Sequence, residues 1–259
     1  LDGSPWPFGD DARLFDSPAE ALEVILALEP RILGIGEFHK LAGSKDVDSA
    51  LRRFADEMID VLGPKTAHLV LETWRVEPGC GQTGQKVEAK VKETIERPPE
   101  TESEMDVLMA KSERYGIKGH VLSFACKEYE GLLGEQGLEH EKLLTLIAKK
   151  LGEAAVMAAQ AENPTKPISI LYGGSTHNDE SPYAGLEGWS YAKTIKEVVG
   201  TGFVELDLYV PEFVEGNELL AQEAWYAELM KEAREGQVIL IKRSDTSYIL
   251  LMRKGYKKS

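Results

Sequence analysis

Two copies of the short pattern Gly-x-x-His, at residues 36–39 and 174–177, are the part of this sequence best suited to chemistry. Each copy directly follows a short apolar run that reads as a buried strand, and its glycine suits a tight strand-to-loop turn. A side chain just past the end of such a strand lies at the edge of a parallel sheet where binding sites form. We therefore expect His39 and His177, which follow different strands, to meet at one reactive centre.

Two glutamates accompany these histidines. Glu37 lies inside the first pattern, and Glu72 closes the apolar run Leu-Val-Leu. A carboxylate at the end of an apolar run is costly unless it is paired or coordinated, so we expect Glu72 to have a functional partner. The alternative is that Glu72 accepts backbone hydrogen bonds from a neighbouring loop. Glu205 and Asp207, in a later run, are weaker candidates.

The residue types predict two chemistries. Glu37, His39, Glu72 and His177 provide the imidazole and carboxylate ligands of a divalent transition metal, whose bound water becomes a nucleophile near neutral pH. Without a metal, a histidine oriented by a glutamate acts as a general base toward water. The sequence predicts a hydrolase of ester or peptide bonds built from these four residues, with the metal-dependent form as the first hypothesis.

Other motifs are incomplete. Gly34-Ile-Gly36 begins like a dinucleotide-binding fingerprint, but His39 occupies the place of the third glycine. No Gly-Lys-Ser/Thr phosphate loop exists, and no Gly-x-Ser-x-Gly elbow surrounds Ser175. We expect His68, His120 and His140 to be structural.

Helical and strand patterns alternate along the chain. Helices are predicted from Ser17 to about 28, from Ser44 to 62, and over 101–115, 138–162, 190–199 and 217–233. Strands are predicted over 32–35, 67–73, 117–123, 167–172 and 203–210, followed by an antiparallel hairpin over 237–242 and 247–253. This order predicts one α/β domain over 1–259, with a mostly parallel sheet, helices on both faces and the C-terminal antiparallel hairpin. Residues 75–99, rich in Pro and Gly, are expected to form an irregular insertion that acts as a lid or a mobile loop.

Charge and composition exclude some partners. The net charge of −14 argues against nucleic acid and against an anionic membrane surface, because both require clustered Lys and Arg. No apolar run approaches the length that spans a bilayer, so we expect no membrane-spanning segment. The expected partner is a small-molecule or peptide substrate. Cys80 and Cys126 follow adjacent strands, where either a disulfide or two free thiols is sterically allowed. A disulfide favours a compartment outside the reducing cytosol.

The motifs together resemble the erythromycin esterase / ChaN / TraB–Tiki superfamily. Leu-Gly-Ile-Gly-Glu37-Phe-His39, Leu-Val-Leu-Glu72 and Leu-Tyr-Gly-Gly-Ser-Thr-His177 correspond to its three signatures, in order and after strands. The last is most similar to the ChaN-like branch. One departure from the esterase pattern is that Lys-Leu-Ala, rather than Gly-Ser or Gly-Thr, follows His39.

The resemblance implies an α/β sheet with a shared site at these four positions, but it does not supply a substrate. Tiki-like members are metal-dependent proteases, erythromycin esterases open macrolactones, and ChaN-like lipoproteins bind haem in iron uptake. The alternative hypothesis is therefore a ChaN-like haem-binding lipoprotein without enzymatic activity. This branch also implies an exported protein, periplasmic or associated with the outer membrane, with a cytoplasmic location as the other alternative.

Overall fold

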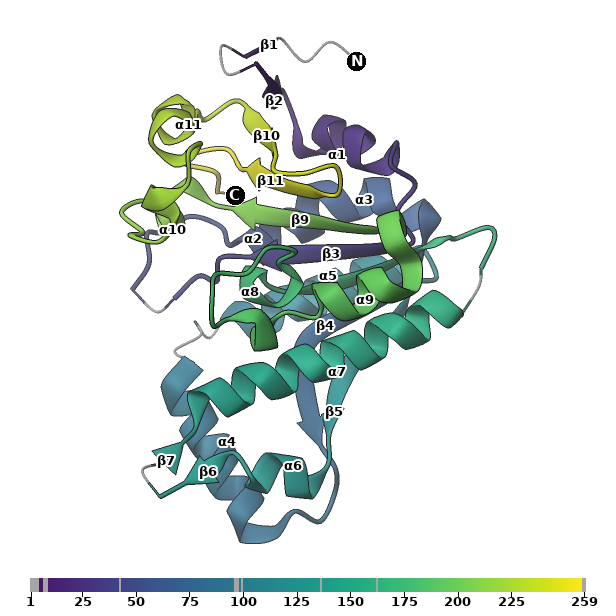
Figure 1. The fold of residues 1–259 in the computed structure, drawn as a ribbon, viewed down its shortest axis with the longest axis vertical. Helices are drawn as coiled ribbons and strands as arrows, with labels where there is room; N and C mark the ends of the chain where they lie inside the picture. Colours follow the sequence, from purple (N-terminus) through teal and green to yellow (C-terminus); the bar gives the residue numbers. More distant parts are fainter. Residues whose placement is uncertain are drawn as a thin grey trace.

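A computed structural model describes residues 5–6, 9–41, 43–95, 98, 100–135, 137–161 and 163–257 of the chain. Its centre is a nine-stranded sheet with the strand order β1-β2-β10-β11-β9-β3-β8-β4-β5 (Figure 1). The strands are β1 Pro5–Trp6, β2 Gly9–Phe15, β3 Ile32–Glu37, β4 Thr66–Val76, β5 Lys118–Phe124, β8 Ile168–Gly174, β9 Phe203–Tyr209, β10 Val238–Lys242 and β11 Ser247–Leu251. A separate two-stranded ribbon consists of β6 Leu133–Gly134 and β7 Gly137–Leu138.

The sheet is parallel at its centre and antiparallel toward one edge. Every neighbouring pair from β11 to β5 is parallel, whereas β10 runs antiparallel to both β11 and β2. The predicted fold class, a mostly parallel sheet with a C-terminal antiparallel hairpin, is confirmed. The carboxyl ends of the parallel strands therefore share one edge of the sheet, where ligands bind in folds of this type.

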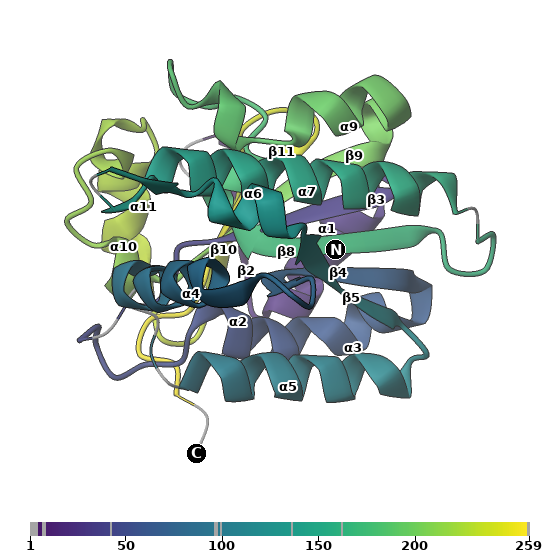
Figure 2. The ribbon, with the colours of Figure 1, turned by 90° about the horizontal axis from the view of Figure 1, so that it is seen from below.

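Helices cover both faces of the sheet, so the molecule has three layers. Figure 2 shows α7 and α9 on one side of the strands and α2, α3 and α5 on the other. The helices are α1 Pro18–Leu26, α2 Ala50–Arg53, α3 Ile59–Leu62, α4 Gly81–Ile95, α5 Glu100–Arg114, α6 Cys126–Glu130, α7 His140–Gln160, α8 Ser175–Asn178, α9 Ala192–Val199, α10 Pro211–Val214 and α11 Tyr226–Glu232. A π-helical turn, Phe54–Met58, joins α2 to α3.

The alternation of side chains along the strands divides the core between the two faces. In β3, Leu33 and Ile35 pack toward α2, α3 and α5, while Ile32 packs toward α7 and α9. Because successive strand residues point to opposite faces, Glu37 is directed to the same side as Leu33 and Ile35. The strand pattern thus sets the layer from which each site residue approaches.

The segment over 75–99, predicted as an irregular insertion, is different in the structure. β4 continues to Val76, and Gly81–Ile95 forms α4, which buries Val87 and Val91. The prediction was wrong because Pro and Gly concentrate near the two ends of this segment and hide a helix with only a thin apolar stripe.

Two other helix predictions need correction. The helix expected from Ser44 begins after Ser49, whose hydroxyl accepts a hydrogen bond from the N–H of Arg52. The helix expected over 217–233 is broken into a short 3-10 turn, Leu220–Gln222, and α11. The first helix does begin as predicted, with the hydroxyl of Ser17 accepting from the N–H of Glu20.

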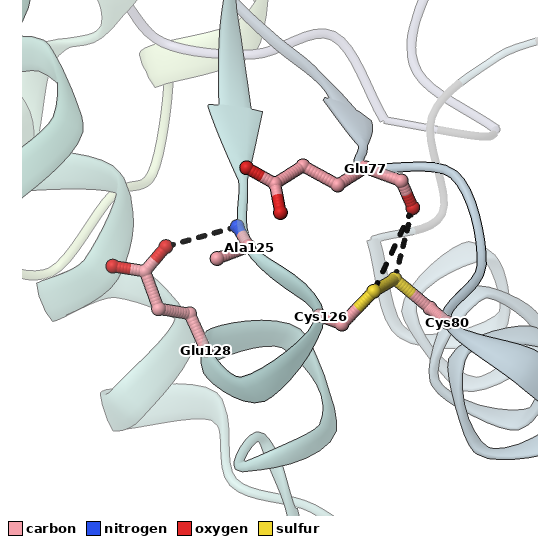
Figure 3. The surroundings of a disulfide bond; sticks show 5 residues. All are labelled: Glu77, Cys80, Ala125, Cys126 and Glu128. Carbon is pink, nitrogen blue, oxygen red and sulfur yellow. Dashed lines mark hydrogen bonds between the residues drawn. A yellow bond between two sulfur atoms is a disulfide. The ribbon is translucent and has the colours of Figure 1, made fainter.

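A disulfide joins Cys80 to Cys126, so the bridged alternative holds for the two cysteines. Figure 3 shows the bridge next to the start of α6, where the Glu128 carboxylate accepts a hydrogen bond from the N–H of Ala125. It links the chain after β4 to the chain after β5. Among the helices that the structure describes, none has the length and apolar character needed to cross a membrane.

Candidate functional site

The four residues predicted from the motifs gather at the carboxyl ends of three neighbouring strands, β3, β8 and β4. Glu37 is the last residue of β3, and His39 lies two positions beyond it. Glu72 belongs to β4, and His177 lies in the short helix α8 that follows β8. Glu37, Glu72 and His177 are buried, whereas the side chain of His39 remains 30% exposed.

Glu37 and His39 form a tight carboxylate–imidazole pair. Oε1 of Glu37 lies 2.6 Å from Nδ1 of His39, and Oε2 accepts a hydrogen bond of 2.6 Å from the hydroxyl of Tyr172. An ionised carboxylate only accepts hydrogen bonds, so Nδ1 of His39 carries the proton. The neutral ring is thereby oriented with Nε2 as its basic nitrogen.

Glu72 lies where β4 departs from regular pairing. The register of β4 against β5 shifts between Leu71 and Trp74, which is a β-bulge that includes Glu72. Bulges redirect side chains next to active sites. Here Oε2 of Glu72 accepts a hydrogen bond of 2.5 Å from the N–H of Gly174. The alternative expectation, that Glu72 accepts backbone hydrogen bonds, is therefore met by one such bond.

His177 is fixed by the loop that precedes α9. Its Nδ1 lies 2.7 Å from the carbonyl oxygen of Trp189, and a carbonyl only accepts, so this nitrogen is also the protonated one. Nε2 of His177 lies 3.8 Å from Oε1 of Glu72, and Nε2 of His39 lies 4.0 Å from the same oxygen. Two basic nitrogens therefore flank one carboxylate oxygen, an arrangement suited to a water molecule or a proton between them.

The same distances test whether these residues fit a metal ion. Ligands at about 2.1 Å from a tetrahedral ion are about 3.4 Å apart, closer than the 3.8 Å and 4.0 Å observed here. Glu37 is occupied by His39 and Tyr172. Within the described ranges, no group of three or more His, Cys, Asp or Glu residues is placed to hold a metal ion. As positioned, Glu72 and the two histidines do not match the spacing of a tetrahedral metal site.

The glycines of both motifs are required by close approach rather than by turn geometry. A Cβ on Gly173 would lie 2.5 Å from Oε2 of Glu72, and one on Gly174 would lie 3.0 Å from Nε2 of His39. None of the glycines at 36, 173 and 174 has a positive φ. The missing side chains at Gly173 and Gly174 leave space for Glu72 and His39.

Glu205 and Asp207 lie in β9 on the far side of β3 and do not join the four-residue set. Both are buried beside Arg243, whose Nη1 lies 3.3 Å from Oε1 of Glu205 and 3.6 Å from Oδ2 of Asp207. Burial raises the pKa of Asp207 to about 7, and burial together with the charge of Asp207 raises the pKa of Glu205. The amide of Asn178 also donates to Asp207, at 3.0 Å.

Three groups at or near the site were not assigned from the sequence. Tyr172 orients Glu37, the carbonyl of Trp189 orients His177, and Arg243 neutralises part of the charge next to the site. Tyr172 was detectable in principle, because it precedes the Gly-Gly of the second motif on a buried strand. A backbone carbonyl and an arginine in a hairpin turn carry no such signal. His68 and His120 pair with each other at 2.9 Å and stay outside the site.

No protein-family model and no curated protein matches the chain. Two solved structures are similar to it. A Bacillus cereus protein has 11% identity and a TM-score of 0.37, covering 77% of this chain and 72% of that one. The type III effector HopBA1 has 12% identity and a TM-score of 0.45, covering 98% of each chain. Likenesses this distant do not bear on function.

Proposed function

We propose that this chain is a hydrolase of ester or peptide bonds in which His39, oriented by Glu37, acts as general base on a water molecule. The single observation that carries the proposal is the hydrogen bond of 2.6 Å between Glu37 and Nδ1 of His39. It directs the basic Nε2 toward Glu72 and leaves the ring partly exposed to a substrate.

The reaction follows from the positions of the proton acceptors. A water molecule at a hydrogen-bonding distance of about 2.8 Å fits between Nε2 of His39 and Oε1 of Glu72, which are 4.0 Å apart. His39 removes a proton from this water as its oxygen attacks the carbonyl carbon of the substrate. The resulting imidazolium lies between the carboxylates of Glu37 and Glu72, which stabilise its charge. It then gives the proton to the leaving group.

His177 serves as a positioning residue on the other side of Glu72. Its Nε2 lies 3.8 Å from Oε1 of Glu72, on a ring held by the carbonyl of Trp189. From this position His177 limits the space open to the side chain of Glu72. With these roles, the chain resembles the hydrolytic members of the erythromycin esterase / ChaN / TraB–Tiki superfamily rather than the haem-binding ones.

The disulfide supports a proposed location. Disulfides persist in oxidising compartments and are rare in a reducing cytosol. The Cys80–Cys126 bridge therefore supports an exported protein, as the ChaN-like branch implies.

The test is hydrolysis of a panel of aryl esters and short peptides by the purified chain. His39→Gln is expected to lower kcat/KM about 100-fold or more, the loss typical of a missing general base. Tyr172→Phe should lower kcat with little change in KM, because it loosens Glu37 without touching substrate. His140→Gln, a histidine exposed at the start of α7, is the matched control and should retain full activity. A His39→Gln protein as active as the parent chain would contradict the proposal.

The same sample separates the alternatives. Elemental analysis and the effect of a chelator on activity test the metal-dependent form, which predicts bound metal and lost activity. A Soret band on titration with haem tests the haem-binding alternative. General-base catalysis by His39 predicts hydrolysis that survives the chelator.

A further inference from the structure

A cavity of about 130 Å³ lies beside the candidate site, and none of the four residues of the site lines it. Its wall includes Phe38, between Glu37 and His39, and Ser175 and Thr176, directly before His177. The remaining wall comes from the end of β9, the loop before α9, the β10–β11 turn and the chain around α11. The end of β9 and the chain around α11 lie on the side toward which the β3 and β9 arrows point in Figure 1, whereas the β10–β11 turn lies at the opposite end of β11. A substrate bound in this cavity lies next to His39.

One wall of the cavity is aromatic. The rings of Tyr209 and Trp225 pack with their centroids 6.1 Å apart. At the rim, Tyr183 and Leu219 are 40% and 55% exposed, among the most exposed large apolar side chains that the structure describes. Such a wall suits an apolar group, and aromatic faces also attract cations.

The charged wall of the cavity is predominantly negative. In this wall, Arg243 faces the carboxyl groups of Asp179 at 3.3 Å and Asp207 at 3.6 Å. Glu223 adds a further carboxylate, which accepts a hydrogen bond of 2.7 Å from the hydroxyl of Tyr183. Burial raises the pKa of Asp207 to about 7, so the negative charge of the wall rests mainly on Asp179 and Glu223. These two carboxylates outnumber the one guanidinium of Arg243, so the wall repels an anionic ligand and attracts a cationic one.

We propose that this cavity binds a cationic, partly apolar group of the substrate, such as the quaternary or protonated amine of an amino-alcohol ester. The assignment to a substrate rests on the hydrolase function proposed above. The aromatic wall holds the apolar portion, the carboxylates attract the positive charge, and the position of Phe38 and Ser175 brings the ester bond toward His39.

The first test is binding, which does not require turnover. Choline and its neutral isostere, in which a tert-butyl group replaces the trimethylammonium group, are titrated into the full chain by calorimetry. Choline is expected to bind about tenfold more tightly than the isostere. Asp179→Asn and Trp225→Ala should each weaken choline binding about fivefold or more, whereas Glu197→Gln, an exposed carboxylate on α9, should not. Equal binding of the two probes, or unchanged binding in both cavity variants, would overturn the proposal.

The second test compares kcat/KM for acetylcholine and for its neutral tert-butyl isostere. A preference for acetylcholine that Asp179→Asn removes supports the proposal. Equal kcat/KM for both esters overturns it while leaving the hydrolase function intact. If choline binds as expected but no ester or peptide is hydrolysed, the hydrolase function fails and the cation-binding cavity stands.

Discussion

His39 and His177 have the same tautomer and a similar orientation: each holds a proton on Nδ1 and directs Nε2 toward Glu72. The difference between them lies in burial and in the partner of Nδ1. His39 is partly exposed and pairs with the carboxylate of Glu37. His177 is buried and pairs with a carbonyl. Two histidines in similar motifs therefore differ in access, and His39 is the one that is partly exposed to solvent.

The raised pKa of Asp207 predicts how the free energy of unfolding depends on pH. Its pKa in the folded chain is raised from 3.8 to about 7, mainly by burial, so the folded state holds its proton over a range where the unfolded state has lost it. The free energy of unfolding therefore falls as the pH rises from about 4 to about 7, and the loss persists above that. Asp207→Asn should flatten this part of the profile and raise the Tm at pH 8.

Thermal unfolding followed at several pH values between 4 and 8 checks this expectation. Asp245→Asn is the control, because Asp245 is exposed in the β10–β11 turn and its hydrogen bond with Lys242 lowers its pKa. That variant should keep the parent slope between pH 4 and 7. A slope unchanged in Asp207→Asn would show that this carboxyl is not the group responsible.

The strands that carry the site depart from regularity in two ways. The register of β4 shifts next to Glu72, and glycines in β3 and β8 remove side chains where neighbours approach. Gly36 is the most crowded of these: a Cβ there would lie 2.2 Å from Oδ1 of Asp207 and 2.6 Å from the Cα of Ser175. The Gly-x-x-His motif is therefore a packing device as well as a source of histidine.

Gly36→Ala should destabilise the chain by about 3 kcal/mol, because both the strand β9 and the backbone of α8 would have to move. Gly188→Ala is the matched control, since a Cβ at that position would meet no atom within 4 Å and its φ is not positive. Its effect should stay within about 0.5 kcal/mol. Urea unfolding of both variants gives the comparison, and a Gly36→Ala protein as stable as the parent would show that this crowding relaxes easily.

At the scale of the molecule, the disulfide links the chain segments that follow β4 and β5, the two strands at one edge of the sheet. It closes a sequence separation of 46 residues that contains α4, α5 and β5. Closing a loop of this length stabilises a folded chain by about 4 kcal/mol in the chain-entropy account. Because β4 carries Glu72, the same bridge also limits the freedom of the strand that supports the site.

The paired change Cys80→Ser and Cys126→Ser should lower the Tm by roughly 10 °C, given about 2–4 °C per kcal/mol for a chain of this size. Adding a reductant to the parent chain should have a similar effect and should leave the serine variant unaffected. Scanning calorimetry with and without reductant makes this measurement. A parent chain whose Tm does not respond to reductant would contradict a stabilising bridge.

The sequence by itself determined the fold class and the membership of the four-residue set. Helical and strand patterns that alternate along the chain required a parallel sheet. Motifs that follow the strands of such a sheet must lie at the same edge. Local patterns were sufficient because strand ends and helix caps depend on neighbours in the sequence. Local patterns did not predict α4, which has few apolar residues, or the break in the helix before α11.

Only the tertiary structure decided how the four residues are arranged relative to one another. Distances of 3.8 Å and 4.0 Å around Glu72 depend on the bulge in β4 and on the carbonyl of Trp189, neither of which has a local signature. The cavity beside His39 is likewise assembled from segments distant in the sequence, from Phe38 to Arg243. Residue types fix which chemistry is available, whereas the packing of distant segments fixes which atoms are close enough to perform it.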